Sequence, residues 1–310
     1  MATQLISEET RGVFPIAATP FSEDGSVDFE SIDSLVDFYL ESGAHGLTIL
    51  GMMGEAHKLS DAESTEVIGR FMRRIDRRVP VIVGVSSPSM LKIVDLSKAA
   101  MDEGCAGVMI TPMSGLKTEA QVLGYFDAVF DALGPEIPVC LQDYPTVTGV
   151  HISNETLLKL IDDHPSIVML KHEDFPGLRK LTEVRKHGDR PDARRISILV
   201  ANAGLYYPIE MRRGADGVMT GFAFPEMLVK VYDLFASGEA DAAEDLYDLY
   251  LPLLRYEYQP GIGLALRKEI LCRRGAIRCT ATRSPGPALN RDEHAELTVL
   301  MDRLQRKLGG

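Results

Sequence analysis

Short runs of apolar residues recur along the first three quarters of the chain, and each is followed by a stretch with helical apolar spacing. The runs are nearly all apolar rather than alternating, which is typical of parallel strands covered on both faces. Eight such runs are present, at residues 13–21, 46–50, 79–85, 107–111, 139–144, 167–171, 196–201 and 217–221. The alternation of buried strands with amphipathic helices predicts an α/β fold.

Helix boundary signals agree with this division. Ser60 is followed three positions later by Glu63, which is the pattern of a capping box at a helix N-terminus. Gly43, Gly104 and Gly214 lie near the expected helix ends, where a left-handed residue is favoured. The helices are therefore expected to end shortly before the next strand begins.

Eight strand–helix units within about 235 residues predict a (β/α)₈ TIM barrel, whose typical length this matches. A doubly wound open sheet is the competing architecture, and it usually carries a glycine-rich phosphate loop after its first strand. Residues 18–21 read Ala-Thr-Pro-Phe and contain no such loop. The barrel is therefore the favoured fold.

The strand pattern stops after residue 235. Residues 240–256, 262–274 and 292–308 have the apolar spacing of helices. We expect a barrel catalytic domain at residues 1–235 and a C-terminal helical region at residues 236–310 that packs on the barrel as an appendage.

Composition narrows the possible partners. The formal net charge of −12 and the pI of about 5.1 argue against a nucleic-acid partner. No apolar run approaches the roughly 18 residues that a membrane span requires, so no membrane partner is expected. The four cysteines form no C-x-x-C pair, which gives no sign of a metal or redox centre. Free thiols and a start without a signal-peptide pattern predict a cytoplasmic protein.

Lys171 ends the sixth apolar run and is the most informative residue in the sequence. A buried ammonium is costly unless it is paired or neutral. Lys171 is therefore either ion-paired, with Glu173 or Asp174, or chemically active. The active sites of TIM barrels lie at the carboxyl ends of the strands, where an amine of lowered pKa can form a Schiff base. Its position alone leaves both alternatives open.

Other polar residues follow the predicted strands at the same end of the barrel. Because strand side chains alternate, Lys171 and Glu173 should point to one side, and so should Gln142 and Tyr144. His172 should point away, into the layer between barrel and helices. Gln142 and Asn202 are neutral hydrogen-bonding groups that suit sugar hydroxyls better than a second carboxylate.

Three motifs in the expected order carry a family resemblance. Gly51-x-x-Gly54-Glu55 follows the second strand, Pro145-x-x-Thr148-Gly149 follows the fifth, and Leu170-Lys171 ends the sixth. Together they resemble the dihydrodipicolinate synthase / N-acetylneuraminate lyase family. The resemblance implies a class I aldolase or dehydratase that forms a Schiff base with a small 2-keto acid such as pyruvate. It also implies that no metal or organic cofactor is needed and that the protein is a homo-oligomer, usually a tetramer.

The sequence departs from the family pattern at several positions. Met52 and Met53 stand where hydroxyl residues are usual, although the backbone N–H groups of Met52 and Met53 could still hold a carboxylate. The tyrosine that transfers protons in the family aligns with Gln142. The arginine that grips a second carboxylate aligns with Val147.

These departures make the chain more similar to another branch, the dehydratases and aldolases of 2-keto-3-deoxy sugar acids, such as L-2-keto-3-deoxyarabonate dehydratase. The residues that carry this similarity are Gln142-Asp143-x-Pro145, Lys171-x-Glu173, Thr220-Gly221-Phe222 and Gly263-Leu264-Ala265-x-Arg267-Lys268.

The branch implies a Schiff-base lyase acting on a 2-keto-3-deoxy sugar acid. We expect Lys171 to form the imine, Glu173 to move protons and Tyr144 to supply a hydroxyl. Gly51, Met52, Met53, Gln142, Asn202 and Thr220 would bind substrate.

Two other readings stay open. One is a dihydrodipicolinate synthase that condenses pyruvate with aspartate semialdehyde through an altered proton relay. The other is a non-catalytic barrel that binds a keto acid, although the retention of Lys171 argues against it. The sequence does not separate dehydration from carbon–carbon cleavage, since both share the imine and the enamine.

Overall fold

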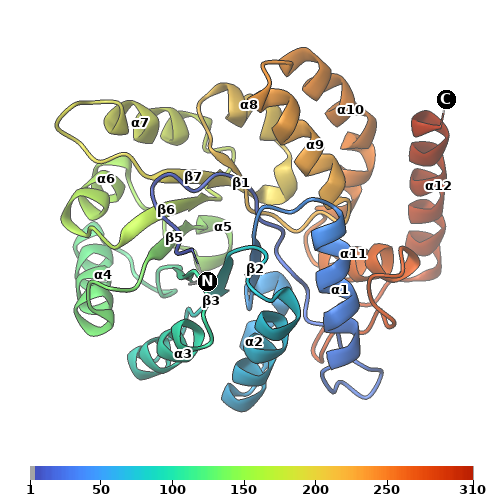
Figure 1. Ribbon diagram of the computed structural model, residues 1–310, viewed down its shortest axis with the longest axis horizontal. Coiled ribbons are helices and arrows are strands. Elements are labelled where there is room, and N and C mark those ends of the chain that lie inside the picture. Colours follow the sequence, from blue (N-terminus) through green and yellow to red (C-terminus); the bar gives the residue numbers. More distant parts are fainter. Residues whose placement is uncertain (1–3, 310) are drawn as a thin grey trace.

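Eight parallel strands form one sheet in the computed structural model, which describes residues 4–309 (Figure 1). The order of the strands in the sheet is β1-β8-β7-β6-β5-β4-β3-β2. Their bounds are β1 Gly12–Val13, β2 Leu47–Ile49, β3 Val81–Gly84, β4 Gly107–Ile110, β5 Val139–Asp143, β6 Ile167–His172, β7 Ser197–Val200 and β8 Gly217–Val218.

The two edges of the sheet meet just beyond β1. Ile16 bridges Thr48 of β2 in parallel, Thr48 N donates to Pro15 O, and Ala17 N donates to Thr48 O, both at 2.9 Å. The sheet therefore closes into the predicted (β/α)₈ barrel. The expectation of a continuous first strand over residues 13–21 was wrong, because Pro15 and Pro20 lack the N–H group that a strand ladder needs.

Helices separate consecutive strands and surround the barrel (Figure 1). Their bounds are α1 Phe29–Glu41, α2 Asp61–Ile75, α3 Met90–Asp102, α4 Glu119–Leu133, α5 Pro145–Thr148, α6 Asn154–Asp163, α7 Leu178–Gly188, α8 Tyr207–Arg212 and α9 Pro225–Ala236. No helix in residues 4–309 combines the length and the apolar composition needed to cross a membrane.

Local signals in the sequence set the helix ends as expected. The Ser60 side chain accepts from Glu63 N, and the Glu63 side chain accepts from Ser60 N, which completes the predicted capping box of α2. Gly43, Gly104 and Gly214 have φ angles of 80°, 84° and 91°. Each one turns the chain after a helix in the left-handed conformation that glycine tolerates best.

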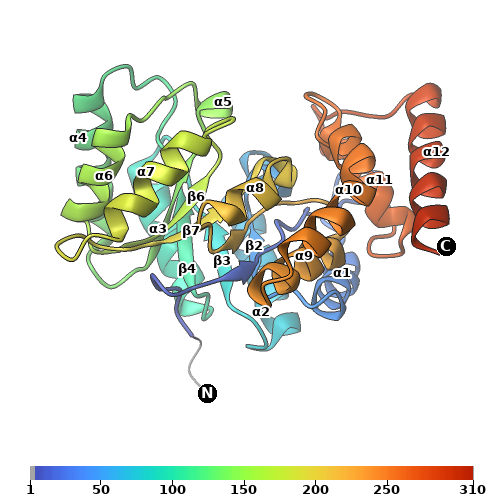
Figure 2. The ribbon, with the colours of Figure 1, turned by 90° about the horizontal axis from the view of Figure 1, so that it is seen from above.

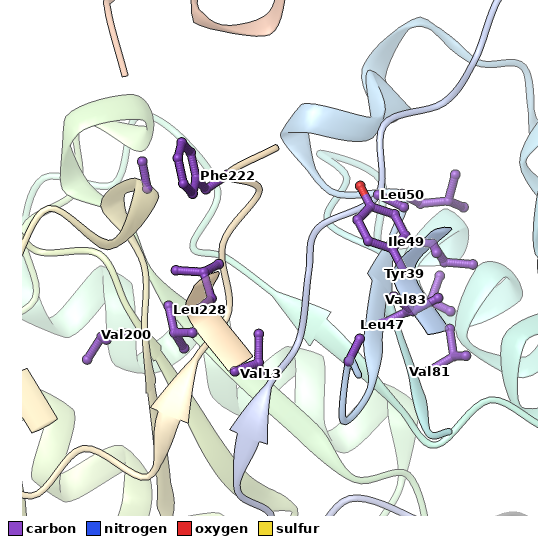
Figure 3. Packing of buried hydrophobic residues seen from close by; sticks show 14 of the residues in the cluster. Val13, Tyr39, Leu47, Ile49, Leu50, Val81, Val83, Val200, Phe222 and Leu228 are labelled. Atoms are coloured by element: carbon purple, nitrogen blue, oxygen red, sulfur yellow. The ribbon is translucent and has the colours of Figure 1, made fainter. Parts of the chain in front are cut away.

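The apolar core has two layers. Inside the barrel, Phe14, Ile16, Ile82, Met109 and Met169 are among the residues of one buried cluster. Outside it, alternate strand residues pack against the helices. Figure 3 shows part of this outer layer, in which residues of β2 and β3 lie beside Tyr39 of α1. Both faces of the strands are covered, as their apolar composition predicts.

An irregularity in β6 sets the direction of the residues that follow. Val139 of β5 pairs with Ile167, but the next residue, Cys140, pairs with Met169, so Val168 is an extra residue in β6. Val168 and Met169 both belong to the inner cluster. Bulges of this kind change which side chains face inward and occur often beside active sites. Met169 and Lys171 then alternate regularly towards the barrel interior.

Three further helices, α10 Ala240–Glu257, α11 Gly263–Arg273 and α12 Arg291–Leu308, lie together at one side of the barrel (Figure 2). Ion pairs join the segment after α11 to the barrel: Arg274 pairs with Glu226 at 2.7 Å and Arg278 pairs with Asp28 at 2.5 Å. The helical region packs closely on the barrel. The division of the chain into a barrel domain and a C-terminal helical region at residue 235 therefore stays a prediction.

Glu210 of α8 gives a first testable prediction. It is buried, and no described group bonds to its Oε2. Burial raises its pKa to about 8 from an ordinary 4.5. A carboxyl with a raised pKa binds its proton more tightly in the folded state, so its stabilising effect is complete below pH 4.5 and is lost as pH rises to about 8. We expect Glu210→Gln to exceed the wild type in free energy of unfolding by about 2 kcal/mol or more at pH 8.5, and by much less at pH 5.

Urea denaturation of both proteins at the two pH values measures this difference. Glu66→Gln, at an exposed position on α2, is the matched control and should show no such change with pH. The same difference between Glu210→Gln and the wild type at both pH values would contradict the prediction.

Candidate active site

Lys171 lies at the carboxyl end of β6 with its ammonium buried. Its Nζ is 2.9 Å from Glu173 Oε2, and the Lys171 side chain is only 3% exposed. Gln142 is the register partner of Lys171 on β5, and its Nε2 donates to the same Glu173 oxygen. One carboxylate oxygen therefore holds the amine and the amide together at the barrel mouth.

The neighbouring charged residues point the other way. Asp143 and Asp174 both pair with Lys180 of α7, at 2.7 and 2.8 Å. His172 Nε2 lies 3.0 Å from Gly177 O at the start of the same helix, and burial lowers the pKa of His172 to about 4. Of the two partners considered for Lys171, the structure thus selects Glu173, and it places His172 in the layer between barrel and helices.

A cavity of about 380 Å³ lies beside this group. Gly51, Met52 and Gln142 line it together with Ser86 and Thr111 from the ends of β3 and β4. Met53 packs instead against the cluster inside the barrel. Val147 also lines the cavity and is 52% exposed. The walls offer hydroxyl, amide and thioether groups and the imidazole of His57 to a ligand.

The loop after β2 has an unusual backbone conformation. Leu50 and Glu55 have φ angles of 52° and 53°, in the left-handed region that side chains rarely adopt. Gly84 of β3 makes room for the turn, because a Cβ atom there would lie 2.3 Å from Leu50 O. Among the described residues, none accepts a hydrogen bond from the amide groups of Met52 or Met53. The loop can therefore offer these N–H groups to a carboxylate.

Glu55, the last residue of this loop, is completely buried and tied to the C-terminal part of the chain. Lys268 Nζ of α11 lies 2.7 Å from one carboxylate oxygen. Lys58 Nζ, at 2.8 Å, and the backbone N of Arg283, at 3.0 Å, contact the other. Burial lowers the pKa of Lys268, and the Glu55 carboxylate opposes the shift. The helical region thus fixes the loop that carries Gly51, Met52 and Met53.

Tyr144 and Asn202 stand on either side of the pair formed by Lys171 and Glu173 along the barrel rim. Tyr144 is half-buried at the end of β5, and burial together with the Glu173 charge raises its pKa. Asn202 follows β7 and accepts a hydrogen bond on Oδ1 from the Tyr258 hydroxyl at 2.9 Å. Its φ of 53° is another left-handed conformation.

Thr220 lies two residues beyond β8, and its carbonyl accepts from Ile16 N at 2.9 Å. The next residue, Gly221, lies against the guanidinium of Arg267, where a Cβ atom would be 2.1 Å from Nη1. Arg267 in turn pairs with the buried Glu257 at 2.7 Å. Two motifs that are distant in sequence, Thr220-Gly221-Phe222 and the one containing Arg267, therefore meet at the barrel mouth.

Ser86 and Tyr258 are candidate site residues that the sequence did not identify. Ser86 directly follows the third apolar run, so its position at a strand end is the signal that could have found it. Tyr258 follows a helix outside the barrel, and no pattern in the sequence links it to Asn202. Within residues 4–309, no group of three or more His, Cys, Asp or Glu side chains is arranged to hold a metal ion.

Comparison with known proteins gives consistent matches. Residues 9–304 match the model of the Dihydrodipicolinate synthetase family. L-2-keto-3-deoxyarabonate dehydratase from Azospirillum brasilense is 30% identical over 303 residues, which cover 95% of this chain and 94% of that protein. 4-Hydroxy-tetrahydrodipicolinate synthase from Methanococcus maripaludis strain C5 is 30% identical over 248 residues, 79% of this chain and 82% of that protein. The crystal structure of a dihydrodipicolinate synthase from Rhodopseudomonas palustris has a TM-score of 0.94 and 44% sequence identity, covering 97% of this chain and 99% of that chain.

The contact between Glu55 and Lys268 gives a second testable prediction. Lys268→Met leaves a completely buried carboxylate oxygen without its cation, which typically costs about 3–5 kcal/mol. We expect Glu55→Gln to recover at least about 1 kcal/mol of that loss in the double variant, because the uncompensated charge is then gone. Urea denaturation of the two single variants and the double variant gives this coupling energy.

Lys58→Met is the matched control, because Lys58 contacts the other oxygen of Glu55 and its side chain is 12% exposed, within reach of solvent. We expect a smaller loss for this variant than for Lys268→Met. Simple additivity of Lys268→Met and Glu55→Gln would show that the pair does not act as a unit.

Proposed function

We propose that this chain, which belongs to the dihydrodipicolinate synthetase family, dehydrates a 2-keto-3-deoxy sugar acid through a Schiff base on Lys171. Members of the family are lyases of the class I aldolase and dehydratase type, so the chain is an enzyme of this class. The observation that carries the proposal is the contact of Lys171 and Gln142 with one Glu173 oxygen, beside a cavity whose described walls include no lysine or arginine.

Imine formation is the first step. Glu173 accepts a proton from Lys171, over the 2.9 Å that separates Oε2 from Nζ. The neutral amine adds to the C2 ketone of the substrate. The carbonyl oxygen leaves as water with one proton from the amine nitrogen and the proton held by Glu173, which becomes a carboxylate again. The backbone amides of Met52 and Met53 hold the substrate carboxylate. The resulting cationic imine acidifies the protons on C3.

Glu173 then carries out the elimination. Its carboxylate takes a proton from C3, and the C–H electron pair forms the enamine. The nitrogen electron pair re-forms the imine as the C4–O bond breaks, and the departing hydroxyl takes the proton back from Glu173 and leaves as water. Hydrolysis of the conjugated imine frees Lys171. Cleavage of C3–C4 from the same imine, with loss of the C4 hydroxyl proton, would be the aldolase alternative.

Neutral groups around the cavity favour a polyhydroxy acid. By the family resemblance, Gln142 replaces the tyrosine that transfers protons, and Val147 replaces the arginine that binds a second substrate carboxylate. Arginine is the side chain best suited to bind a carboxylate bidentately. Ser86, Thr111 and Gln142 offer hydroxyl and amide partners instead. The matched dehydratase from A. brasilense acts, by its name, on such a 2-keto-3-deoxy acid.

Condensation of pyruvate with aspartate semialdehyde is the second candidate. The similarity to the dihydrodipicolinate synthases of R. palustris and M. maripaludis favours it. Tyr144 would then have to supply protons in place of the residue at position 142. A non-catalytic keto-acid-binding barrel would not need a buried lysine at this position, where burial requires a partner such as Glu173.

The partners follow from this proposal. We expect a small 2-keto acid as substrate, no metal or organic cofactor, and a homo-oligomer in the cytoplasm, with a tetramer as the family's usual assembly. The molar mass in solution, measured by light scattering, tests the tetramer.

The Schiff base gives a third testable prediction. Incubation with pyruvate and borohydride should fix one reduced pyruvate on the protein, detected as a mass increase in the intact chain. Lys171→Ala should abolish the adduct, because it removes the amine that lies 2.9 Å from Glu173 Oε2. Lys98→Ala, at an exposed position on α3, is the matched control and should retain it.

A screen of 2-keto-3-deoxy acids with the wild type follows, with aspartate semialdehyde plus pyruvate as the competing assay. Wild-type protein that is folded but forms no adduct would exclude the imine mechanism for pyruvate. If the protein consumes aspartate semialdehyde in the presence of pyruvate but turns over no 2-keto-3-deoxy sugar acid, the second candidate is favoured.

A further inference from the structure

A tyrosine of the helical region reaches the barrel mouth. Tyr258 directly follows α10, and its hydroxyl donates to Asn202 Oδ1 beyond the end of β7. Leu199 of β7 is the register partner of Lys171, so Asn202 follows the strand next to the one that carries the amine. Burial and the Glu173 charge raise the pKa of Tyr258. Tyr258 and Asn202 therefore form a pair beside the reacting amine, made of one residue from each part of the chain.

Helix α10 also holds the turn that carries Asn202. Asn202 and Ala203 have φ angles of 53° and 57°, and a left-handed alanine is unfavourable unless its surroundings enforce it. The hydroxyl of Tyr247 donates to Gly204 O at 2.9 Å and to Leu205 O at 2.8 Å. The same helix therefore fixes this turn at one point and supplies the hydrogen-bond partner of Asn202 at another.

The remaining hydrogen-bonding capacity of the pair is specific. The proton of Tyr258 is engaged by Asn202 Oδ1, so the phenol oxygen can still accept a hydrogen bond, and the Asn202 amide nitrogen can still donate one. One neutral acceptor beside one neutral donor matches an alcohol, which both donates and accepts. A carboxylate would only accept, and the phenol oxygen offers it nothing.

The surroundings of the pair are aromatic. The Phe175 ring lies 6.4 Å from the ring of Tyr258 and 5.5 Å from that of Tyr206, measured between centroids. The carbon chain of a ligand could pack against these rings while one of its hydroxyl groups contacts Tyr258 and Asn202. This environment suits a carbon chain that bears hydroxyl groups.

We infer that Tyr258 is a specificity-determining residue, which together with Asn202 binds a hydroxyl group of the substrate on the far side of C3 from the Schiff base. The inference rests on the proposed function and adds to it the group that distinguishes a sugar acid from pyruvate. The helical region thereby sets substrate choice in addition to packing on the barrel.

Tyr258→Phe tests the inference, because it removes the hydroxyl and keeps the ring. We expect kcat/KM for the best 2-keto-3-deoxy sugar acid to fall by about 10-fold or more, mainly through KM, since the contact holds substrate and transition state alike. Trapping of pyruvate by borohydride should stay within about twofold of the wild type, because pyruvate has no such hydroxyl. Asn202→Gly, which tolerates the left-handed conformation of this residue, should show the same pattern, and the double variant should lose little more than either single variant.

Tyr256→Phe is the matched control. Tyr256 is two residues away, in the last turn of α10, and its hydroxyl donates to Glu296 at 2.6 Å on α12. It should leave both the sugar-acid kinetics and the trapping unchanged.

Unchanged kcat/KM in Tyr258→Phe would overturn the inference. An equal loss in sugar-acid turnover and in pyruvate trapping would also overturn it, because Tyr258 would then support the Lys171 site as a whole. The wild type is assayed first, and one outcome is that it traps no pyruvate or turns over none of the sugar acids. That result removes the proposed function and this inference with it.

Discussion

One carboxylate oxygen organises the barrel mouth. Glu173 Oε2 accepts from Lys171 and from Gln142, so two polar side chains that would be costly to bury alone are paired in one place. The strand alternation that sends Lys171 and Glu173 inward sends His172 and Asp143 outward to α7. The extra residue Val168 in β6 determines which of the residues after it face the barrel interior. Without it, the inward and outward positions would exchange.

A second buried carboxylate connects the two parts of the chain. Glu55 ends the loop that can hold a substrate carboxylate, and the groups that neutralise it come from Lys58, Lys268 and the backbone of Arg283. A buried carboxylate that no water can solvate needs cations and N–H groups of the protein to compensate its charge. The helical region therefore helps to build the barrel mouth, and its contacts with Glu55, Gly221 and Asn202 are spread around the barrel rim.

The fold was predictable because its signals are local or periodic. Buried parallel strands give apolar runs, and capping residues such as Ser60 and glycines such as Gly104 mark the helix ends. The contact of Lys171 with Glu173 was also predictable, since alternation over two residues decides it. The length of β1 was not, because an extended segment can close a sheet through single bridges such as that between Ile16 and Thr48.

The contacts made by the helical region lie beyond such rules. Tyr258 is 56 positions from Asn202, and Lys268 is 213 positions from Glu55, so no periodicity relates them. Such pairs depend on how a whole helix docks, which is decided by tertiary packing. Lys171, the proposed Schiff-base residue, lies on a strand whose direction the barrel fixes, whereas Tyr258 lies at a helix end. The end of α10 could therefore change, and with it the hydroxyl that is recognised, without disturbing Lys171 or Glu173.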